Sequence, residues 1–332
     1  MLTNRTRFSF ARIGAAFALM VAATGAAAQT WPTARPITFT VPYAAGSVND
    51  VMMRLVANAV GVRMKTTVIV ENVNGAGGVL ATEKVARAKP DGYNFIMGVD
   101  STILLAQLVK PAVVKYDGLR DFTPVAMMAT SPLVIVARPD LPVSDMQGFL
   151  KAVSANPKAY SYGTSGIGTS LHIAGEMLNK ESGAELTHVP YAVSTQIMTD
   201  VAGSQLDLAI VPIGSAATFV RSGKVKALAV TSVERSPSLP NVPAARETHG
   251  LEKFNAGVWF GVFAPKDIEP TIVAHMAAEI GAALQTEDIQ KRFFDMGVQS
   301  NFMPPERFQP FLLAQRARLK TVVEEKKIRV DQ

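Results

Sequence analysis

The chain contains no cysteine, and its 332 residues include only four histidines and two tryptophans. Without cysteine it can form no disulfide, so packed cores must supply its stability. At roughly 150 residues per domain the length predicts two domains, and a hydrophobic content of 48% is enough for two cores. None of the histidines stands in an H-x-x-x-H or H-E-x-x-H arrangement, so the sequence has no zinc-site pattern.

Motifs that mark common enzyme classes are also missing. Gly163-Thr164-Ser165-Gly166 is not the G-x-S-x-G elbow of a serine hydrolase. Gly75-Ala76-Gly77 begins like a dinucleotide-binding fingerprint, but Leu80 stands where the third glycine belongs, and there is no Walker A lysine. The sequence therefore favours binding of a ligand over its chemical conversion.

Acidic residues near the expected loops leave two interpretations open. Asp50, Glu71 and Asp100 are either a catalytic carboxylate set or helix caps and supports, and no nucleophile or cofactor motif accompanies them. His172 and Glu176, four residues apart on one expected helix, are either a metal pair or a local surface pair. Ordinary structural roles suffice for all five residues.

The N-terminal residues have the three parts of a secretory signal peptide. Three arginines precede an apolar run over residues 13–23, and Ala26-Ala27-Ala28 then offers a cleavage site, which predicts a leader over residues 1–28. A membrane anchor is the alternative, but the run is too short to cross about 30 Å of hydrocarbon. No cysteine follows the run, which excludes lipid attachment there.

The mature chain carries little net charge and no further apolar run that could span a membrane. Removing three arginines leaves 33 − 3 = 30 Lys+Arg against 27 Asp+Glu, so the net charge falls from +6 to +3. No basic run is interleaved with aromatic residues, so nucleic-acid binding has no support.

The first segment after the leader predicts a strand, a tight loop and a helix. Apolar and polar residues alternate over residues 37–41, and apolar residues recur at helical spacing over residues 51–60. In the loop between them, Ser47 followed by Asp50 is typical of a capping box. The first N–H groups of a helix lack intrahelical partners, so a carboxylate or phosphate fits there. The alternative is an ordinary βα unit that binds nothing.

This pattern repeats, which predicts a parallel α/β sheet in each half of the chain. Further strands are expected over residues 66–70 and 93–99, and a second series begins at Tyr160. Residues 124–137 and 254–264 are expected to cross between the two halves. Helices are expected at the end of the chain over residues 270–284, 290–296 and 305–325.

Five loops, around Ser47, Gly75, Ser101, Ser165 and Ser194, are expected at the carboxyl ends of strands. Ligands of open α/β sheets bind at this edge. The loops are rich in hydroxyl groups and backbone amides and contain no lysine or arginine. The sequence therefore predicts a cleft between two lobes that binds a small anion through helix N-termini.

Several of these segments resemble the motifs of one known family. Residues 37–54 resemble a strand followed by V-P-[FY]-x-x-G-G-x-x-D-x-x-x-R, residues 70–78 resemble V-E-N-x-x-G-A-G-G, and Pro90-Asp91-Gly92-Tyr93 is a further marker. Residues 162–172 resemble the Ser/Gly-rich loop of the second lobe and residues 257–265 the returning strand. Over nearly the whole mature chain, the sequence resembles the Bug (Bordetella uptake gene) family, the TctC-like substrate-binding receptors of tripartite tricarboxylate transporters.

The resemblance implies an α/β fold, that of a two-lobed periplasmic binding protein of type II, or Venus flytrap, with two crossing strands as hinge. Lobe 1 is expected over residues 29–130 plus 256–332 and lobe 2 over residues 131–255. The implied function is capture of a small mono-, di- or tricarboxylate for membrane permease subunits, with no cofactor, no metal and no catalysis. We expect a monomer in the periplasm. The alternative is a periplasmic enzyme or ligand sensor on the same fold.

The resemblance also implies which loops line the cleft, with ordered water helping to hold a carboxylate there. The implied ligand-binding residues are Tyr43, Ala45, Gly46, Ser47, Asp50, Asn74, Gly75, Ala76, Gly77, Asp100, Ser101, Thr102, Thr164, Ser165, Gly166, Gly168, Thr169, Tyr191 and Ser194.

The chain departs from the family pattern at several of these loops. Ser47 replaces a glycine and Asn74 replaces a proline. Ala192-Val193 stand where the family often has Lys-Gly, and no acidic residue stands near Val211-Pro212. Losing both charges disfavours an amino-acid ligand and leaves open a less polar, for example aromatic, carboxylate.

Overall fold

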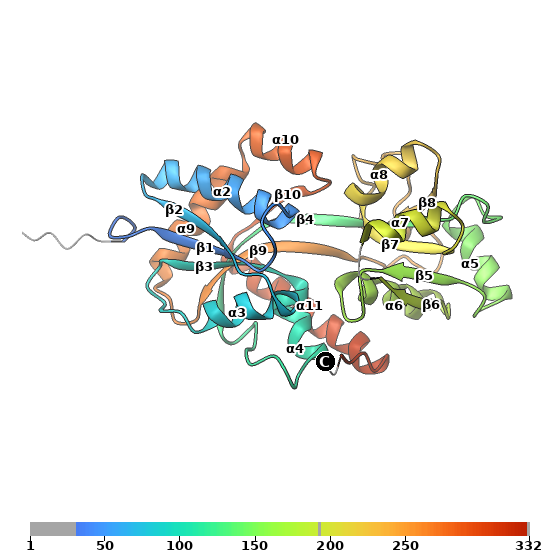
Figure 1. The fold of residues 1–332 in the computed structure, drawn as a ribbon, viewed down its shortest axis with the longest axis horizontal. Helices are drawn as coiled ribbons and strands as arrows, with labels where there is room; N and C mark the ends of the chain where they lie inside the picture. The colour runs from blue at the N-terminus through green and yellow to red at the C-terminus, as the bar shows by residue number, and fades with distance from the viewer. Residues whose placement is uncertain (1–30, 192–193, 331–332) are drawn as a thin grey trace, which may run out of the picture.

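The computed structural model describes residues 31–191 and 194–330 and shows two bodies joined by a pair of long strands (Figure 1). We name the body built on strands β1, β2, β3 and β10 the first lobe and the body built on β5 to β8 the second lobe. The expected leader, residues 1–28, lies outside the described residues, as do Ala192 and Val193.

The sheet of the first lobe begins with three parallel strands. β1 (Ile37–Val41) lies between β2 (Val68–Asn72) and β3 (Asn94–Val99), and β3 then pairs antiparallel with β9 (Gly257–Pro265). The prediction of a parallel sheet is therefore wrong beyond β3, because β9 returns from the second lobe and enters the sheet in the opposite direction. β10 (Gln299–Met303), which the sequence did not predict, pairs with β4.

β4 (Phe122–Ala137) is a single strand of 16 residues that belongs to both lobes. Its first part pairs with β9 and β10, and Leu133 to Ala137 pair with β7 (Leu208–Pro212) and β8 (Lys226–Val230). In the second lobe β5 (Ser161–Thr164) lies parallel to β7 and to β6 (Thr187–Pro190). The two long strands, β4 and β9, therefore cross between the lobes, as the apolar stretches predicted.

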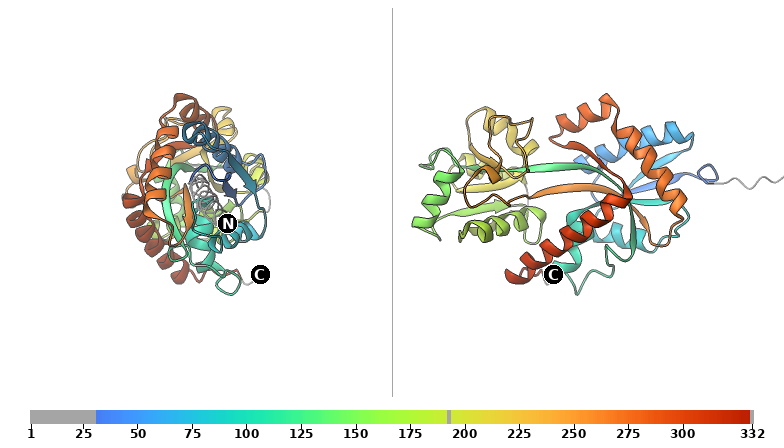
Figure 2. Two further views of the ribbon diagram at one scale, coloured as in Figure 1. Left: turned by 90° about the vertical axis from the view of Figure 1, so that its left-hand side faces the viewer. Right: turned by 180° about the vertical axis from the view of Figure 1, so that it is seen from behind.

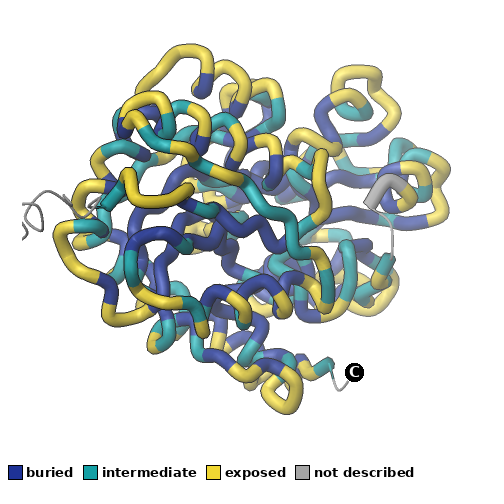
Figure 3. The backbone as a smooth tube through the Cα atoms, turned by 60° about the vertical axis from the view of Figure 1, so that its left-hand side comes forward, coloured by how far each residue is buried: buried dark blue, intermediate teal, exposed yellow. Residues whose placement is uncertain are grey.

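Helices cover both sheets and bury their apolar faces against them, so the strands are mostly buried and the outer helix faces exposed (Figure 3). The helices of the first lobe are α2 (Val48–Met64), α3 (Val79–Ala86), α4 (Ala106–Val109), α9 (Pro270–Leu284), α10 (Glu287–Asp295) and α11 (Pro305–Glu325). Those of the second lobe are α5 (Met146–Ala155), α6 (Ser170–Ser182), α7 (Ser194–Ala202) and α8 (Ile213–Arg221). Short helical turns lie at η2 (Ala76–Gly78), η3 (Ser101–Leu105) and η4 (Ala245–Glu247).

Two of these helices correct the sequence interpretation. The helix expected from Ile103 is a π-helical turn, η3, followed by the single turn of α4. α8 was not expected at all. Within residues 31–191 and 194–330, no helix is long and apolar enough to cross a bilayer.

α11 connects the two lobes behind the crossing strands. Seen from behind, it runs obliquely beneath β4 and β9 toward the second lobe (Figure 2), where it packs on α6. Ion pairs join the two helices, Lys180 to Glu325 at 2.6 Å and Arg318 to Glu181 at 3.3 Å. The lobes are therefore linked by a helix contact as well as by two strands.

Candidate ligand-binding site

A cavity of about 670 Å³ lies between the lobes, at the carboxyl ends of the parallel strands. In the first lobe its walls come from the segments that follow β1, β2 and β3, and in the second lobe from those that follow β5 and β7. Val258 and Phe260 of the crossing strand β9 also line it. Parallel strands put their following loops at one edge, which is why segments so far apart in sequence meet here.

The N-termini of three helices line this cavity. Val48 and Asn49 belong to the first turn of α2, Ser170 and Leu171 to that of α6, and Gly214 and Ser215 to that of α8. Unpaired N–H groups and the helix dipole give each end partial positive charge. One end belongs to the first lobe and two to the second, so an anion between them faces positive potential from both sides.

Side chains cap the α2 and α6 ends. Ser47 Oγ accepts a hydrogen bond from the Asp50 N–H at 3.3 Å, and Thr169 Oγ1 accepts one from the His172 N–H at 3.3 Å. Pro212 precedes α8 and gives it no side-chain cap, so the first N–H groups of α8 keep their hydrogen-bonding capacity.

Asp50 locks the loop before α2 and does not line the cavity. Its buried carboxylate accepts hydrogen bonds from the Gly46 N–H at 2.8 Å, from Asn72 Nδ2 at 2.9 Å and from Arg54 Nε at 3.1 Å. Burial alone would raise the pKa of Asp50, but the hydrogen bonds from Arg54, Gly46 and Asn72 outweigh it, so the pKa is lowered. The same Asn72 amide also donates to the Tyr43 carbonyl at 3.1 Å, which ties the loop to the end of β2.

The turn at η2 brings backbone close to the cavity. Gly75, Ala76, Gly77 and Gly78 all have positive φ, between 50° and 148°. A side chain at Gly78 would meet Thr102 Cγ2 at 2.6 Å, whereas one at Gly77 would meet no atom within 4 Å. The turn therefore requires a glycine at Gly78, whereas Gly77 leaves open space beside the cavity.

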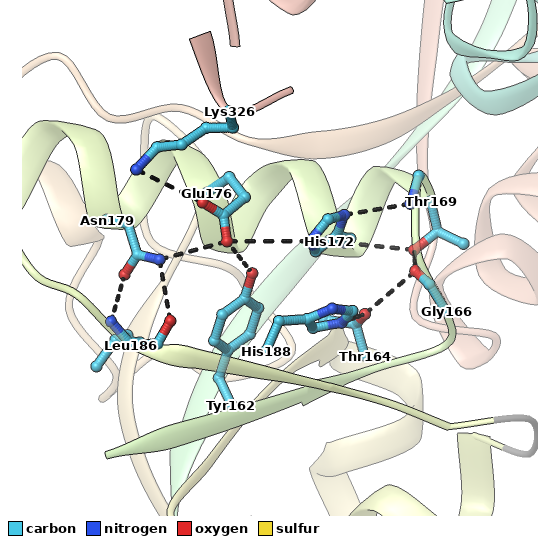
Figure 4. Close-up of polar contacts among 11 residues, drawn as sticks. Tyr162, Thr164, Gly166, Thr169, His172, Glu176, Asn179, Leu186, His188 and Lys326 are labelled. Carbon is cyan, nitrogen blue, oxygen red and sulfur yellow. Dashed lines mark hydrogen bonds and ion pairs between the residues drawn. The ribbon is translucent and has the colours of Figure 1, made fainter. Parts of the chain in front are cut away.

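A polar network behind the second-lobe loop holds that loop in place (Figure 4). The Gly168 N–H donates to His172 Nδ1 at 3.2 Å, and Thr164 Oγ1 lies 2.7 Å from His188 Nε2. The two imidazole rings lie against each other with centroids 4.0 Å apart and an interplanar angle of 31°. His172 Nε2 is 3.9 Å from Glu176. The pair of His172 and Glu176 is therefore a buried structural pair, and not the surface pair that the sequence suggested.

Burial lowers the pKa of both histidines. For His172 the nearby Glu176 opposes the effect of burial only in part, and for His188 burial and then the charge of His172 lower the pKa to about 4. Both rings are therefore neutral at neutral pH, and because His172 Nδ1 accepts the Gly168 N–H, the one ring proton of His172 lies on Nε2.

Asp100 lines the cavity from the end of β3 and is 5% exposed. Its Oδ1 is buried and accepts no hydrogen bond from the described residues. Burial raises its pKa to about 7, and the Ser170 hydroxyl and the Ser101 amide offset this only in part. Beside it Tyr43 Oη lies 3.2 Å from Ser101 Oγ, and burial also raises the pKa of Tyr43.

The structure brings eight of the predicted residues into the cavity wall. These are Tyr43, Ala76, Gly77, Asp100, Ser101, Ser165, Gly168 and Thr169. Residues of the same loops that do not line the cavity are Ala45, Gly46, Ser47, Asp50, Asn74, Gly75, Thr102, Thr164, Gly166 and Tyr191. Tyr191, for example, donates its hydroxyl to Asp200 at 2.8 Å. Ser194 begins α7, and its side chain is not described.

Sequence reasoning missed Lys110 and the start of α8. Lys110 follows α4 and is the one lysine or arginine among the described residues that line this cavity. It lies after the turn of α4 and outside the five loops, so the motifs of those loops did not include it. Gly214 and Ser215 follow a strand that ends in Pro212, which is the same pattern of strand and small residues that identified the other loops.

A second cavity of about 630 Å³ lies on the other side of the crossing strands. Along β9, Phe260 lines only the first cavity and Trp259 only the second, whereas Val258 lines both. Asp100 and Ser170 line both cavities and so lie between them. No cluster of three or more metal-ligating side chains occurs among the described residues.

Comparisons with known proteins agree with this geometry. The sequence model of the tripartite tricarboxylate transporter family receptor matches residues 52–328. The periplasmic binding protein BugD has 31% sequence identity and a TM-score of 0.71, over 90% of this chain and 99% of that one.

Two similar structures contain a ligand. Rpa4515 of R. palustris with adipate has 28% identity and a TM-score of 0.75, over 90% of this chain and 99% of the other. MatC (Rpa3494) from Rhodopseudomonas palustris with bound malate has 31% identity and a TM-score of 0.71, over 87% and 99%.

Proposed function

This chain belongs to the tripartite tricarboxylate transporter receptor family, and on that basis we propose that it captures a small carboxylate in the cavity between its lobes. The family consists of solute-binding receptors, and its members are periplasmic. Similar receptors are known with adipate and with malate. A ligand of this class, with one to three carboxylates, is therefore the one we assign to this site.

The observation that carries the proposal is the convergence of three helix N-termini on one cavity. Each end contributes roughly 0.3–1 kcal/mol toward an anion, more when partly buried. Charge-assisted hydrogen bonds from N–H groups add about 1.5–3 kcal/mol each, and Lys110 supplies a full positive charge. Together they are sufficient for micromolar binding, which corresponds to about −8 kcal/mol.

The apolar part of the wall suits the carbon skeleton of the ligand. Val99, Val258 and Phe260 line the cavity beside the polar loops. Its volume lies within the range of about 300–1,000 Å³ that small-molecule sites occupy. Dicarboxylates with a short chain and aromatic carboxylates both fit this combination of helix ends and apolar surface.

We also propose that the lobes close on the ligand about β4 and β9, with lobe 1 formed by residues 29–130 plus 256–332 and lobe 2 by residues 131–255. The pairing of β4 with strands of both lobes supports this division. The closed, loaded monomer delivers its ligand to the membrane permease subunits of a tripartite transporter. Catalysis has no part in this proposal, so turnover of a bound carboxylate would favour the alternative, a periplasmic enzyme.

Export is the first step of the proposed function. Ala26-Ala27-Ala28 motivates cleavage after Ala28, with a mature chain that begins at Gln29. N-terminal sequencing of the exported protein tests this. A mature protein that begins before Gly14 would show that the leader is not removed as proposed.

A thermal-shift screen against a panel of carboxylates tests the ligand class. The protein is refolded first, to remove carried-over ligand, and the panel includes malate, adipate and benzoate. A ligand at 100 times its Kd stabilises the protein by about 2.7 kcal/mol, which is a melting shift of several degrees for a chain of this size. The uncharged amides are the controls, and the carboxylate hypothesis fails if they shift the melt as much as the acids do.

Substitutions at the helix caps then test the site. Ser47→Val and Thr169→Val remove hydroxyl groups at the N-termini of α2 and α6, and we expect binding about tenfold weaker, which equals about 1.4 kcal/mol. Thr321→Val on the exposed side of α11 is the matched control. Unchanged affinity in both cap variants would place the site elsewhere.

A further inference from the structure

Asp100 presents a conflict for a receptor of anions, because it places an acid in the wall of the anion site. It follows β3 directly, is 5% exposed, and lies between the cavity in front of the crossing strands and the cavity behind them. Its Oδ1 has no hydrogen-bond donor among the described residues. A buried carboxyl oxygen without a partner is rare in a native protein and calls for an explanation.

Hydroxyl groups and apolar side chains lie beside Asp100, and the one lysine or arginine among the described residues that line the first cavity is Lys110. Ser101 and Tyr43 lie beside it in the first lobe, Ser170 begins α6 of the second lobe, and Ser131 and Val258 belong to the crossing strands. The other titratable or charged groups that line the two cavities are Tyr43, Lys110, Asp295, Glu234, Arg235 and Arg318. Arg235 pairs with Glu247 and Arg318 with Glu181, and no ion pair between described residues reaches Asp100.

An ionised carboxylate in this position is unfavourable even before a ligand arrives. Desolvation of an unpaired charge costs several kcal/mol, and at Asp100 it exceeds what Ser170 and the Ser101 amide return. A carboxylate ligand then brings a second negative charge into the same cavity. Two like charges at close range do not both remain ionised, as in the carboxyl pairs of aspartic proteases.

We propose that Asp100 recognises the ligand as a neutral acid, donating its O–H to a ligand carboxylate oxygen, and that binding above pH 7 is accompanied by uptake of up to one proton per ligand. This inference rests on the proposed function and adds a specificity rule to it. A neutral donor at Asp100 selects carboxylates that carry no ammonium group near this position. An amino-acid ligand would require the opposite state, an ionised Asp100 as counter-ion for its ammonium group.

The sign and the pH range follow from linkage. Above pH 7 the free receptor loses the Asp100 proton, and the complex must recover it, so affinity falls as the pH rises by up to about tenfold per pH unit. Malate and adipate are fully ionised in this range. The lowered pKa values of His172 and His188 and the raised pKa of Tyr43 keep these groups from titrating between pH 7 and 9.

Calorimetric titration with malate and adipate, in buffers of different ionisation enthalpy, measures the proton uptake directly. For the wild type we expect close to one proton per ligand at pH 8 and a Kd that rises by about 50-fold from pH 7 to pH 9. Asp100→Asn keeps the size of the side chain and an N–H donor but cannot titrate. In this variant we expect binding at pH 8 without proton uptake and a Kd that stays within about twofold from pH 7 to pH 9.

Asp288→Asn is the control. It removes an exposed carboxylate on α10 that does not line the cavity, and it should keep the wild-type proton uptake. Binding by the wild type without proton uptake overturns the proposal. A second result also overturns it. If the wild type prefers aspartate to malate, and folded Asp100→Asn no longer binds malate or adipate, then Asp100 acts as an ionised counter-ion for an ammonium group.

An infrared measurement on the ligand-free protein separates this inference from the proposed function. At pH 6 the wild type should show a protonated-carboxyl C=O band that Asp100→Asn lacks. If no member of the carboxylate panel binds, the proposed function fails, yet this band still reports on Asp100. If the band is absent from the wild type, the neutral state of Asp100 is refuted whatever ligand the receptor binds.

Discussion

Lys326 Nζ lies 3.6 Å from Glu176 Oε2 and so joins the residue after α11 to the middle of α6 in the second lobe. The same carboxylate accepts a hydrogen bond from the buried Tyr162 hydroxyl at 2.7 Å, and His172 lies beside it (Figure 4). Through His172 the contact extends to Gly168 in the wall of the ligand cavity. The helix that links the lobes is therefore connected by polar contacts to the loop that faces the ligand.

Replacing the two ends of this pair should have unequal effects on stability. Glu176→Ala leaves the fully buried Tyr162 hydroxyl without its acceptor, which costs about 1–3 kcal/mol. Lys326→Ala removes a partly exposed charge and should cost less than about 1 kcal/mol. Urea unfolding measures both, with Lys320→Ala in an exposed pair on α11 as the control. Equal losses for Glu176→Ala and Lys326→Ala would show that the Tyr162 bond contributes nothing.

His172 and His188 should make the protein less stable in mild acid. Their pKa values are lowered in the folded state, so below pH 6.5 the unfolded chain binds more protons and stability falls as the pH falls toward 4. Asp100 acts in the opposite direction, because its raised pKa lets the folded state hold an extra proton between about pH 4 and 7. The comparison is therefore made in an Asp100→Asn background.

In that background, the urea concentration at the unfolding midpoint should decrease as the pH is lowered from 7.5 to 6.5 and 5.5. Adding His172→Gln and His188→Gln should make this decrease smaller. Asp50 does not interfere, since its lowered pKa moves its contribution below this range. An equally steep dependence after both replacements would assign the acid sensitivity to other groups.

The two adjacent glycines of η2 should differ strongly in their tolerance of alanine. Gly78→Ala puts a Cβ 2.6 Å from Thr102 Cγ2 and 3.1 Å from Pro42 Cβ at a φ of 94°, and we expect a loss of about 2–4 kcal/mol. Gly77→Ala has a φ of 67° and no atom within 4 Å, so only the left-handed conformation costs, about 1 kcal/mol. Thermal unfolding measures both losses, and similar values would contradict the close packing of Gly78 against Thr102.

Asn72 should affect ligand binding although it does not line the cavity. Asn72→Ala removes the amide donor to both the Tyr43 carbonyl and Asp50, which costs about 1–3 kcal/mol of stability. Because these bonds fix the loop that carries Tyr43 and starts α2, we also expect weaker carboxylate binding. Asn58→Ala, on the same lobe but outside the first cavity, is the matched control. Titration calorimetry measures the affinity of each variant. If Asn72→Ala binds the carboxylate as tightly as the wild type and Asn58→Ala do, the Asn72 hydrogen bonds do not contribute to ligand binding.

Local signals were sufficient for the elements whose ends are marked in the sequence. α9 and α11 span the predicted residues because Pro270 and Pro305 occupy first-turn positions, where proline loses no hydrogen bond. The π-helical turn η3 was missed, because apolar residues at helical spacing predict a helix but not its type. β10 has no such pattern, since its residues are only partly buried and pair with β4 from more than 160 positions away.

The sequence by itself determined the two α/β halves, the crossing stretches, and the loops of small residues at strand ends, because periodicity and turn chemistry act within a few residues. Only the tertiary structure decided that β9 enters its sheet antiparallel, that α8 and Lys110 join the cavity, and that Asp50 supports a loop while Asp100 lies in the wall with one oxygen that has no partner among the described residues. These features depend on strand pairing, desolvation and contacts between distant segments, and no local pattern in one chain encodes which buried carboxylate finds a partner.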